Sequence, residues 1–334
     1  MTHVLAVRLD NEGDVLLAGP AIRALAAGAE HVTMLCGPRG RQAAALLPGV
    51  DDMLVWRAPW IDPEAAPVEH ADVAALIAQV AALRVDRALV FGSFHQSPLP
   101  TALVLRLAGV PWIGATSVDY PGALLDLRHA IDDDVHEVER SLDLVGAAGF
   151  VLPVGDAGEL RVTGVAPADI PPGYVVVHPG ASVPARAWAP ERNAELVAAL
   201  AAAGRRVVVT GGPAERELTA FVAGSQALDL GGATDFAGLA GVIAGADAIV
   251  VGNTGPAHLA AAVGTPVLSL FAPTVPAVRW RPWRVPHELL YVDVPCAGCR
   301  ARVCPVAGHP CLGGVEVADV VAAVDRLVPL AVAA

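Results

Sequence analysis

Apolar runs typical of buried strands alternate with Ala- and Leu-rich runs typical of helices, and this alternation restricts the possible folds more than any other feature. In the first half the strand-like runs are 4–9, 31–37, 50–56 and 87–93, and the helix-like runs begin near Asp14, at 41 and at 70. The strands are almost continuously hydrophobic, which favours a parallel sheet covered on both faces. The order of the runs predicts a doubly wound α/β fold.

The same pattern stops at a Pro-rich stretch, 150–173, and then begins again. Strands are expected at 174–180, 205–212, 227–232, 248–253 and 266–273, and a last helix from about Val315. Because 334 residues exceed what a single core usually supports, the sequence predicts two Rossmann-like domains, 1–165 and 166–334, facing a central cleft. The last helix either stays with the second domain or packs back on the first.

Charge excludes some classes of partner. The chain has net charge −12 and no lysine, so any cationic site must be built from Arg or His. Residues 1–165 hold 11 Arg against 21 acids, and residues 166–334 hold 11 Arg against 13 acids. A nucleic-acid binder needs a basic face, so nucleic acid is not expected as a partner. An acidic first half also argues against docking on anionic lipid.

Neither a signal peptide nor a transmembrane segment is expected. The beginning of the chain has no basic segment, and Arg8 interrupts its short apolar run. The longest stretch without Asp, Glu or Arg, 248–278, contains Asn-Thr-Gly-Pro and Gly-Thr-Pro, which break a spanning helix. These features predict a cytoplasmic protein.

Three loops follow predicted strands, where such sheets bind ligands. The first lies in "RLDNEGDVLLAGPAIRAL", 8–25, and places Asp10 and Asp14 around Gly13. Gly13 permits close backbone approach or an unusual φ. Asp14 is either a helix-start acid, stabilised by about 0.3–1 kcal/mol, or a carboxylate aimed at a ligand.

The second loop, "HPGASVPARAWAP" at 178–190, carries one cation, Arg186. Small residues expose backbone N–H groups, and the Arg fork can hold phosphate oxygens. The loop lacks the Lys and the spacing of an ATPase phosphate loop. It is either a phosphate site or an ordinary turn with a solvated Arg.

The third loop, within "VVGNTGPAHLAAAVGTP" at 250–266, starts a helix. Asn, Thr and then Pro are ordinary residues at a helix start. The same geometry binds anions through free N–H groups and the helix dipole. His258, in the first turn, is either a packed core histidine or a ligand-binding group.

In combination and order, these segments resemble a known family. "RLDNEGDVLL", "HPG…ARAW.PER", "TGGPAE", "GNTGPAHLAAAVGTPVLSLFAPT" and "RWRPW" are similar to the ADP-heptose:lipopolysaccharide heptosyltransferases, glycosyltransferase family nine. The resemblance covers nearly the whole chain and is weakest at about 57–150. It implies a GT-B fold, with an acceptor on the first domain and a nucleotide-diphospho-sugar, ADP-heptose, on the second. It also implies an inverting transfer that needs no metal or other cofactor.

The resemblance also implies roles for individual residues. The family's catalytic base falls on Asp14, and its phosphate-binding Lys falls on Arg186. The acid that holds the ribose falls on Glu215, with Glu217 as the alternative. Asp14 would take the proton of the acceptor hydroxyl as that oxygen attacks the anomeric carbon. Arg186 would stabilise the departing diphosphate.

The donor-binding loop of the family falls on Asn253, Thr254, Gly255 and His258. Most members have Asp where this chain has Asn253, and that Asp contacts sugar hydroxyls. Asn donates and accepts hydrogen bonds but carries no charge, so the identity of the sugar stays open. On the acceptor side the candidates are Gly13, Asp10 and His95.

The cysteine-rich segment "CAGCRARVCPVAGHPC" is a candidate metal site. Cys296, Cys299, Cys304 and Cys311 could hold structural zinc, with His309 as a fifth candidate ligand. The alternatives are packed reduced thiols or disulfides, and disulfides are disfavoured in a cytosolic protein. Cys36 stands alone in a predicted strand and is expected in the core.

Several functions remain open at this stage. A GT-B transferase could use a different NDP-sugar. A GT-B-type nucleotide-sugar epimerase or hydrolase would need a second acid–base group, for which His95 is a candidate. A binding protein without catalysis would have no need for Gly13-Asp14, and no Gly-x-Gly-x-x-Gly follows the first strand to support a dehydrogenase. Coulomb repulsion from the acidic first domain favours a neutral or cationic acceptor, a glycan or natural product.

Overall fold

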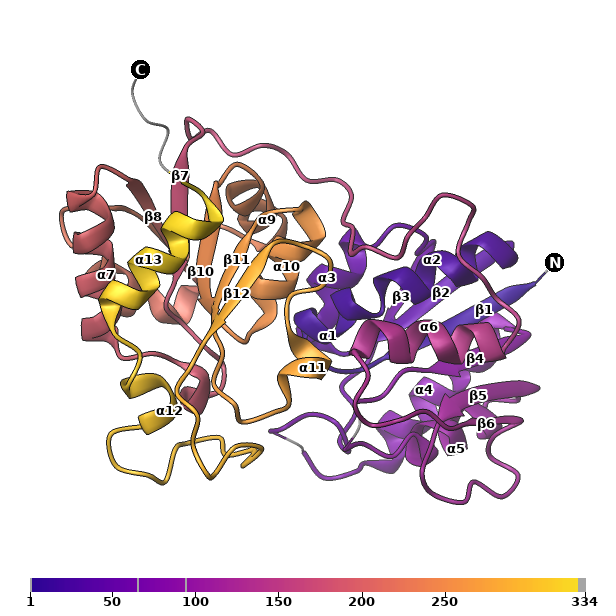
Figure 1. Cartoon of the computed structure of the whole chain (residues 1–334). Helices are drawn as coiled ribbons and strands as arrows, with labels where there is room; N and C mark the ends of the chain where they lie inside the picture. Colours follow the sequence, from indigo (N-terminus) through magenta and orange to yellow (C-terminus); the bar gives the residue numbers. More distant parts are fainter. Residues whose placement is uncertain (1, 65, 94, 330–334) are drawn as a thin grey trace. The chain divides into compact units, whose positions relative to one another are not determined.

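The computed structural model describes residues 2–64, 66–93 and 95–329, and the chain forms two compact units, Met1–Thr163 and Gly164–Ala334. Each unit is built on a parallel six-stranded sheet with helices packed against it (Figure 1). The doubly wound α/β class expected from the alternating runs is therefore confirmed. Residues 151–173, within the expected linker, form neither helix nor strand.

The first unit has the strand order β3-β2-β1-β4-β5-β6. Its strands are β1 (His3–Arg8), β2 (His31–Cys36), β3 (Asp52–Val55), β4 (Arg87–Val90), β5 (Trp112–Thr116) and β6 (Leu127–His129). Its helices are α1 (Glu12–Leu17), α2 (Gly19–Gly28), the 3₁₀ turn η1 (Pro38–Gly40), α3 (Arg41–Leu46), α4 (His70–Leu83), α5 (Leu99–Leu107) and α6 (Glu137–Ala147). The strand order reverses between β1 and β4, which is where such sheets bind ligands.

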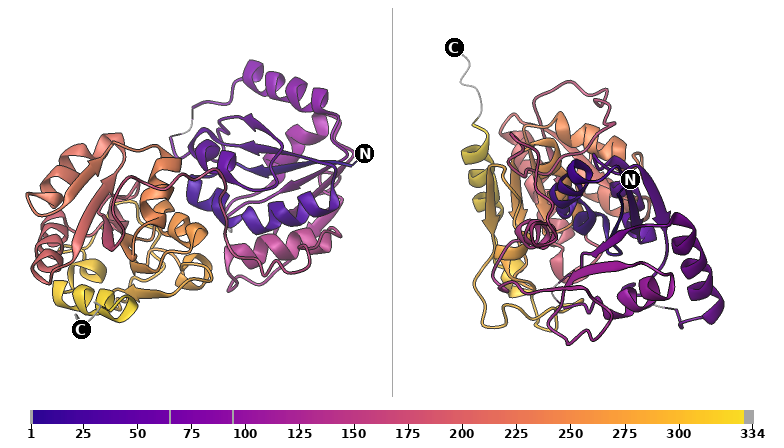
Figure 2. Two further views of the ribbon diagram at one scale, coloured as in Figure 1. Left: turned by 90° about the horizontal axis from the view of Figure 1, so that it is seen from above. Right: turned by 90° about the vertical axis from the view of Figure 1, so that its right-hand side faces the viewer.

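Burial on both faces explains the continuous apolar runs of this sheet. Leu5 and Val7 of β1 join a core cluster with Leu76 of α4 and Leu105 of α5. Successive strand residues point to opposite faces, so the equally buried Val4 faces the other layer. Figure 2 (left) shows helices on both sides of the first sheet. Cys36, in β2, is fully buried, as expected.

The second unit repeats this arrangement with the order β12-β11-β10-β7-β8-β9. Its strands are β7 (Tyr174–His178), β8 (Arg206–Gly211), β9 (Leu228–Gly231), β10 (Ala248–Gly252), β11 (Val267–Leu270) and β12 (His287–Leu290). Its helices are η2 (Pro184–Arg186), α7 (Pro190–Ala202), η3 (Pro213–Glu215), α8 (Arg216–Ala223), α9 (Phe236–Ala244), α10 (Gly255–Val263), α11 (Ala277–Trp280), α12 (Pro310–Gly313) and α13 (Val317–Leu327). Its order reverses between β7 and β10.

The last helix belongs to the second unit. Val320, Ala323 and Val324 of α13 are buried in one core cluster with Leu196 and Leu200 of α7. The sequence left open a return of this helix to the first domain, but its apolar face is already covered by its own unit. Among the described residues, no helix combines the length and the apolar character needed to cross a bilayer.

Candidate functional site

The opening loop places its acids at the carboxyl end of β1. The strand ends at Arg8, and α1 begins at Glu12, so that Asp14 lies in the first helical turn. Burial raises the pKa of Glu12 to about 7. Gly13 is buried within the helix. Its backbone is therefore helical, which excludes the second of the two roles that the sequence left open, an unusual φ.

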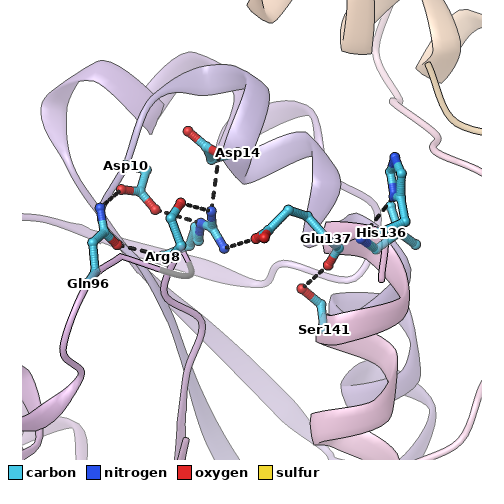
Figure 3. A network of polar contacts seen from close by, with 9 residues as sticks. Arg8, Asp10, Asp14, Gln96, His136, Glu137 and Ser141 are labelled. Atoms are coloured by element: carbon cyan, nitrogen blue, oxygen red, sulfur yellow. Dashed lines mark hydrogen bonds and ion pairs between the residues drawn. The ribbon is translucent and has the colours of Figure 1, made fainter. Parts of the chain in front are cut away.

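A network of polar contacts surrounds Arg8 (Figure 3). The guanidinium Nε lies 2.8 Å from Asp10 Oδ2, and Nη2 lies 3.2 Å from Asp14 Oδ1. Nη2 also donates to Ser93 Oγ at 2.9 Å, and Nη1 lies 3.8 Å from Glu137 Oε2. Burial acts to lower the pKa of Arg8, but the three carboxylates outweigh it and raise that pKa. Arg8 therefore stays charged.

Asp10 is held from the opposite side by the loop after β4. Gln96 donates from Nε2 to Asp10 Oδ1, and its own Oε1 accepts from the Ser93 N–H. Burial raises the pKa of Asp10, against the opposing charge of Arg8. His95 is exposed and is one of the charges that act on Asp10. The predicted acceptor-side residues Asp10, Gly13 and His95 thus come from the two loops at the point where the strand order reverses.

In the second unit, Arg186 lies in the turn η2 after β7. Its Nε donates to Thr274 Oγ1 at 3.4 Å. Gly252, the last residue of β10, lets the Arg186 backbone come close, because a Cβ there would lie 2.7 Å from the Arg186 carbonyl oxygen. The turn is therefore packed against the start of the third predicted loop. Arg186 also helps to lower the pKa of His258, although burial is the larger cause.

The third loop contains three buried polar atoms that have no hydrogen-bond partner within the described part of the chain. These atoms are Asn253 Oδ1, Thr254 Oγ1 and His258 Nδ1. The Asn253 amide donates from Nδ2 to the Ala272 carbonyl at 3.2 Å, which leaves Oδ1 as an acceptor. Burial lowers the pKa of His258 to about 4, so its ring is neutral at pH 7. Buried polar atoms normally have partners, so this cluster indicates a ligand site.

The backbone adds donors at the same place. Thr254 is the N-cap of α10, and its side chain makes no capping bond. The first N–H groups of a helix have no partner within it and attract anions. Gly255 is the first residue of the helix, so these amides lie beside the three unpartnered side-chain atoms. The structure thus brings Asn253, Thr254, Gly255 and His258 together with Arg186.

Glu215 lies in η3, after β8. It accepts from the Gly212 N–H at 2.7 Å, and a Cβ at Gly180 would collide with its carboxylate. Burial lowers the pKa of His178, the last residue of β7, and the negative charge of Glu215 acts in the opposite direction. The alternative, Glu217, is exposed on α8. Glu215 is therefore the acid that lies against the loop carrying Arg186.

The cysteine-rich segment lines a pocket in the second unit. The pocket is lined by His309 and by four cysteines with free thiols: Cys296, Cys299, Cys304 and Cys311. Within the described ranges, no three His, Cys, Asp or Glu side chains gather so as to hold a metal ion. The structural zinc suggested by the cysteine spacing therefore has no converging set of ligands among the described residues.

The same segment fixes the backbone of the Arg186 turn. The Ala185 N–H donates to the Arg302 carbonyl at 3.0 Å, and His309 Nε2 lies 3.1 Å from the Ala185 carbonyl oxygen. The Arg300 N–H donates to the carbonyl of Thr274, whose hydroxyl holds Arg186. The segment thus supports the position of a candidate phosphate-binding residue.

Residues 73–309 match the family model described as glycosyltransferase family 9 (heptosyltransferase). The chain belongs to glycosyltransferase family 9. The resemblance inferred from the motifs is thereby confirmed. The matched range begins after Asp14, so the assignment of the base does not rest on it.

Two curated relatives match about half of the chain and half of their own length. Lipopolysaccharide heptosyltransferase 3 of Escherichia coli is 32% identical over 168 residues, 47% of each chain. Lipopolysaccharide heptosyltransferase 1 of Pseudomonas aeruginosa is 36% identical over 174 residues, 51% of this chain and 48% of its own. The structure of E. coli ADP-heptose lps heptosyltransferase II has a TM-score of 0.74 at 19% identity over 98% of both chains, which supports the fold.

Sequence reasoning missed three members of the Arg8 network in this family 9 protein. Ser93, Gln96 and Glu137 lie far along the chain from the opening loop and belong to no motif. Arg8 was noticed only because it interrupts an apolar run. A charged residue at the end of an otherwise buried strand was the available signal, because such a charge needs buried partners.

Proposed function

We propose that the chain is an inverting heptosyltransferase that moves heptose from ADP-heptose to an acceptor hydroxyl. In this proposal the first unit binds the acceptor and the second binds the donor. The observation that carries it is the set of buried, unpartnered polar atoms beside Arg186 at the start of α10. Membership of family 9 and the names of the relatives support ADP-heptose as the donor.

Each part of the donor has a matching group. The diphosphate would lie on the N-terminal amides of α10 and on Arg186. Glu215 would accept hydrogen bonds from the ribose hydroxyls, and Asn253 Oδ1 would accept one from a sugar hydroxyl. His258, being neutral, can bind a polar group without adding a charge.

The transfer itself requires one base and a stabilised leaving group. Asp14 takes the proton from the acceptor hydroxyl while that oxygen forms a bond to the anomeric carbon. The bond from this carbon to the diphosphate breaks, and ADP leaves from the opposite face. Because Arg186 and the α10 amides balance the charge that develops on the diphosphate, no step uses a metal ion.

The acceptor is proposed to be a neutral or cationic glycan or natural product. Asp10, Asp14 and Glu137 share the Arg8 guanidinium, and Glu12 lies nearby in the same helical turn as Asp14. The field of these carboxylates and the net charge of the first half would both oppose an anionic acceptor.

A second candidate keeps the reaction and changes the sugar. Asn253 occupies the position where the family pattern has an Asp that contacts sugar hydroxyls, and its Nδ2 is already bonded to Ala272. Asn253 therefore presents one uncharged oxygen to the nucleotide sugar as a hydrogen-bond acceptor, whereas a carboxylate would present charged oxygens. A different NDP-sugar is therefore the alternative donor.

A calorimetric comparison of nucleoside diphosphates tests the donor. ADP, UDP, GDP, CDP and dTDP would be titrated into EDTA-treated protein. We expect ADP to bind at least about tenfold more tightly than the others, a difference of about 1.4 kcal/mol. A preference for another diphosphate would remove ADP-heptose while keeping the family and the site.

A further inference from the structure

Arg8 connects the proposed base to segments that are distant in sequence. It ends β1, whereas Ser93 follows β4 and Glu137 begins α6. Both Arg8 and Glu137 are essentially inaccessible to solvent. A guanidinium in such a place requires well-placed carboxylates and hydrogen-bond acceptors, since an uncompensated buried charge is strongly destabilising.

Each nitrogen of the Arg8 guanidinium has a separate partner. Nε faces Asp10, Nη1 faces Glu137, and Nη2 contacts both Ser93 and Asp14. Partners on several sides restrict rotation of the planar group, and Figure 3 shows Asp10, Asp14 and Glu137 around the guanidinium. Nη2 is thus fixed at 3.2 Å from Asp14 Oδ1.

We propose that Arg8 is the positioning residue of the base: it holds Asp14 through Oδ1 so that Oδ2 meets the acceptor hydroxyl. The inference rests on the proposed role of Asp14. Ser93 and Glu137 set the orientation of the guanidinium and thereby that of Asp14. Lysine cannot replace Arg8 fully, because one ammonium cannot face partners in four directions.

The test measures hydrolysis of ADP-heptose, with water as the acceptor, in Arg8→Met. We expect kcat to fall about 10- to 100-fold, since misplacement of a catalytic group has effects of this order. The KM for ADP-heptose and the affinity for ADP should stay within about twofold, as expected for an interaction made only in the transition state. Arg8→Lys should recover part of the lost kcat.

Arg23→Met is the matched control. Arg23 is also a buried arginine of the first unit, and it pairs with Asp156 through Nε at 2.6 Å and Nη2 at 2.9 Å. Its loss removes a similar ion pair without touching the Arg8 network. We expect lower thermal stability in Arg23→Met with kcat within about twofold of the parent protein.

A double-mutant cycle separates positioning from a general structural role. In an Asp14→Asn background, Arg8→Met should change the residual rate by less than about twofold, because its effect acts through Asp14. Equal losses in both backgrounds would overturn the inference, as would an Arg8→Met protein with nearly full kcat. Near-full activity of Asp14→Asn itself, with Arg8 intact, would overturn the proposed function, a separate and distinguishable result.

Ser93→Ala keeps the test available if Arg8→Met does not fold. This variant removes only the hydroxyl that accepts from Nη2. We expect kcat to fall about 2- to 10-fold, the scale of one hydrogen bond, with the donor KM unchanged. An unchanged kcat in folded Ser93→Ala would contradict the inference.

Discussion

Asp14→Asn is expected to reduce turnover of ADP-heptose by about 10²- to 10⁴-fold, the usual contribution of a general base. Asparagine keeps the size of the side chain but cannot take the proton of the attacking hydroxyl. Its amide can still lie beside the Arg8 guanidinium, so the fold of the first unit should be retained. Steady-state release of ADP from ADP-heptose measures the effect.

Binding of ADP provides the control for Asp14→Asn. The groups proposed to hold the donor, Arg186, Glu215 and the start of α10, all belong to the second unit. The affinity for ADP should therefore remain within about twofold of the parent value. A variant with nearly full turnover would show that Asp14 is only a helix-start acid.

Arg186→Ala is expected to weaken ADP binding about 10- to 100-fold, the scale of hydrogen bonds to a charged group. The substitution removes the cation that lies beside His258 and is held by Thr274. The diphosphate would then keep only the amides of α10 as its donors. Isothermal titration of ADP into EDTA-treated protein measures the loss.

Arg192→Ala is the matched control for Arg186→Ala. Arg192 belongs to the same unit and contacts Glu195 and Glu316 at the surface, at 3.4 and 3.2 Å. Its removal takes one positive charge from the unit, as Arg186→Ala does. Equal weakening of ADP binding in both variants would mean that only long-range charge matters, contrary to the proposed site.

The fold was predictable where local pattern and burial agree. The expected strands 4–9 and 248–253 correspond to β1 and β10, whose interiors are fully buried and apolar. The expectations did not include β5, β6 or β12, and the last two each form one edge of their sheet. β6 and β12 are short and only partly buried, so they lack a continuous apolar run.

The candidate sites were predictable only where one loop carries the signal. Arg186 and Asn253 each stand in a loop directly after a predicted strand, and the parallel topology brings the ends of β7 and β10 together. The Arg8 network depends on contacts across long stretches of chain, such as Ser93, which is 85 residues from Arg8. The cysteine spacing suggested a zinc site, but spacing alone does not determine whether thiols converge on one point, and no three ligands gather among the described residues.

The anomeric configuration of the heptose released from ADP-heptose tests the central claim most directly. The purified, EDTA-treated protein would hydrolyse the donor, and proton NMR would follow the sugar before its anomers equilibrate. We expect release without added metal, with the first-formed anomer opposite in configuration to the sugar in the donor. Retention of configuration, or no release from ADP-heptose while another NDP-sugar is cleaved, would contradict it.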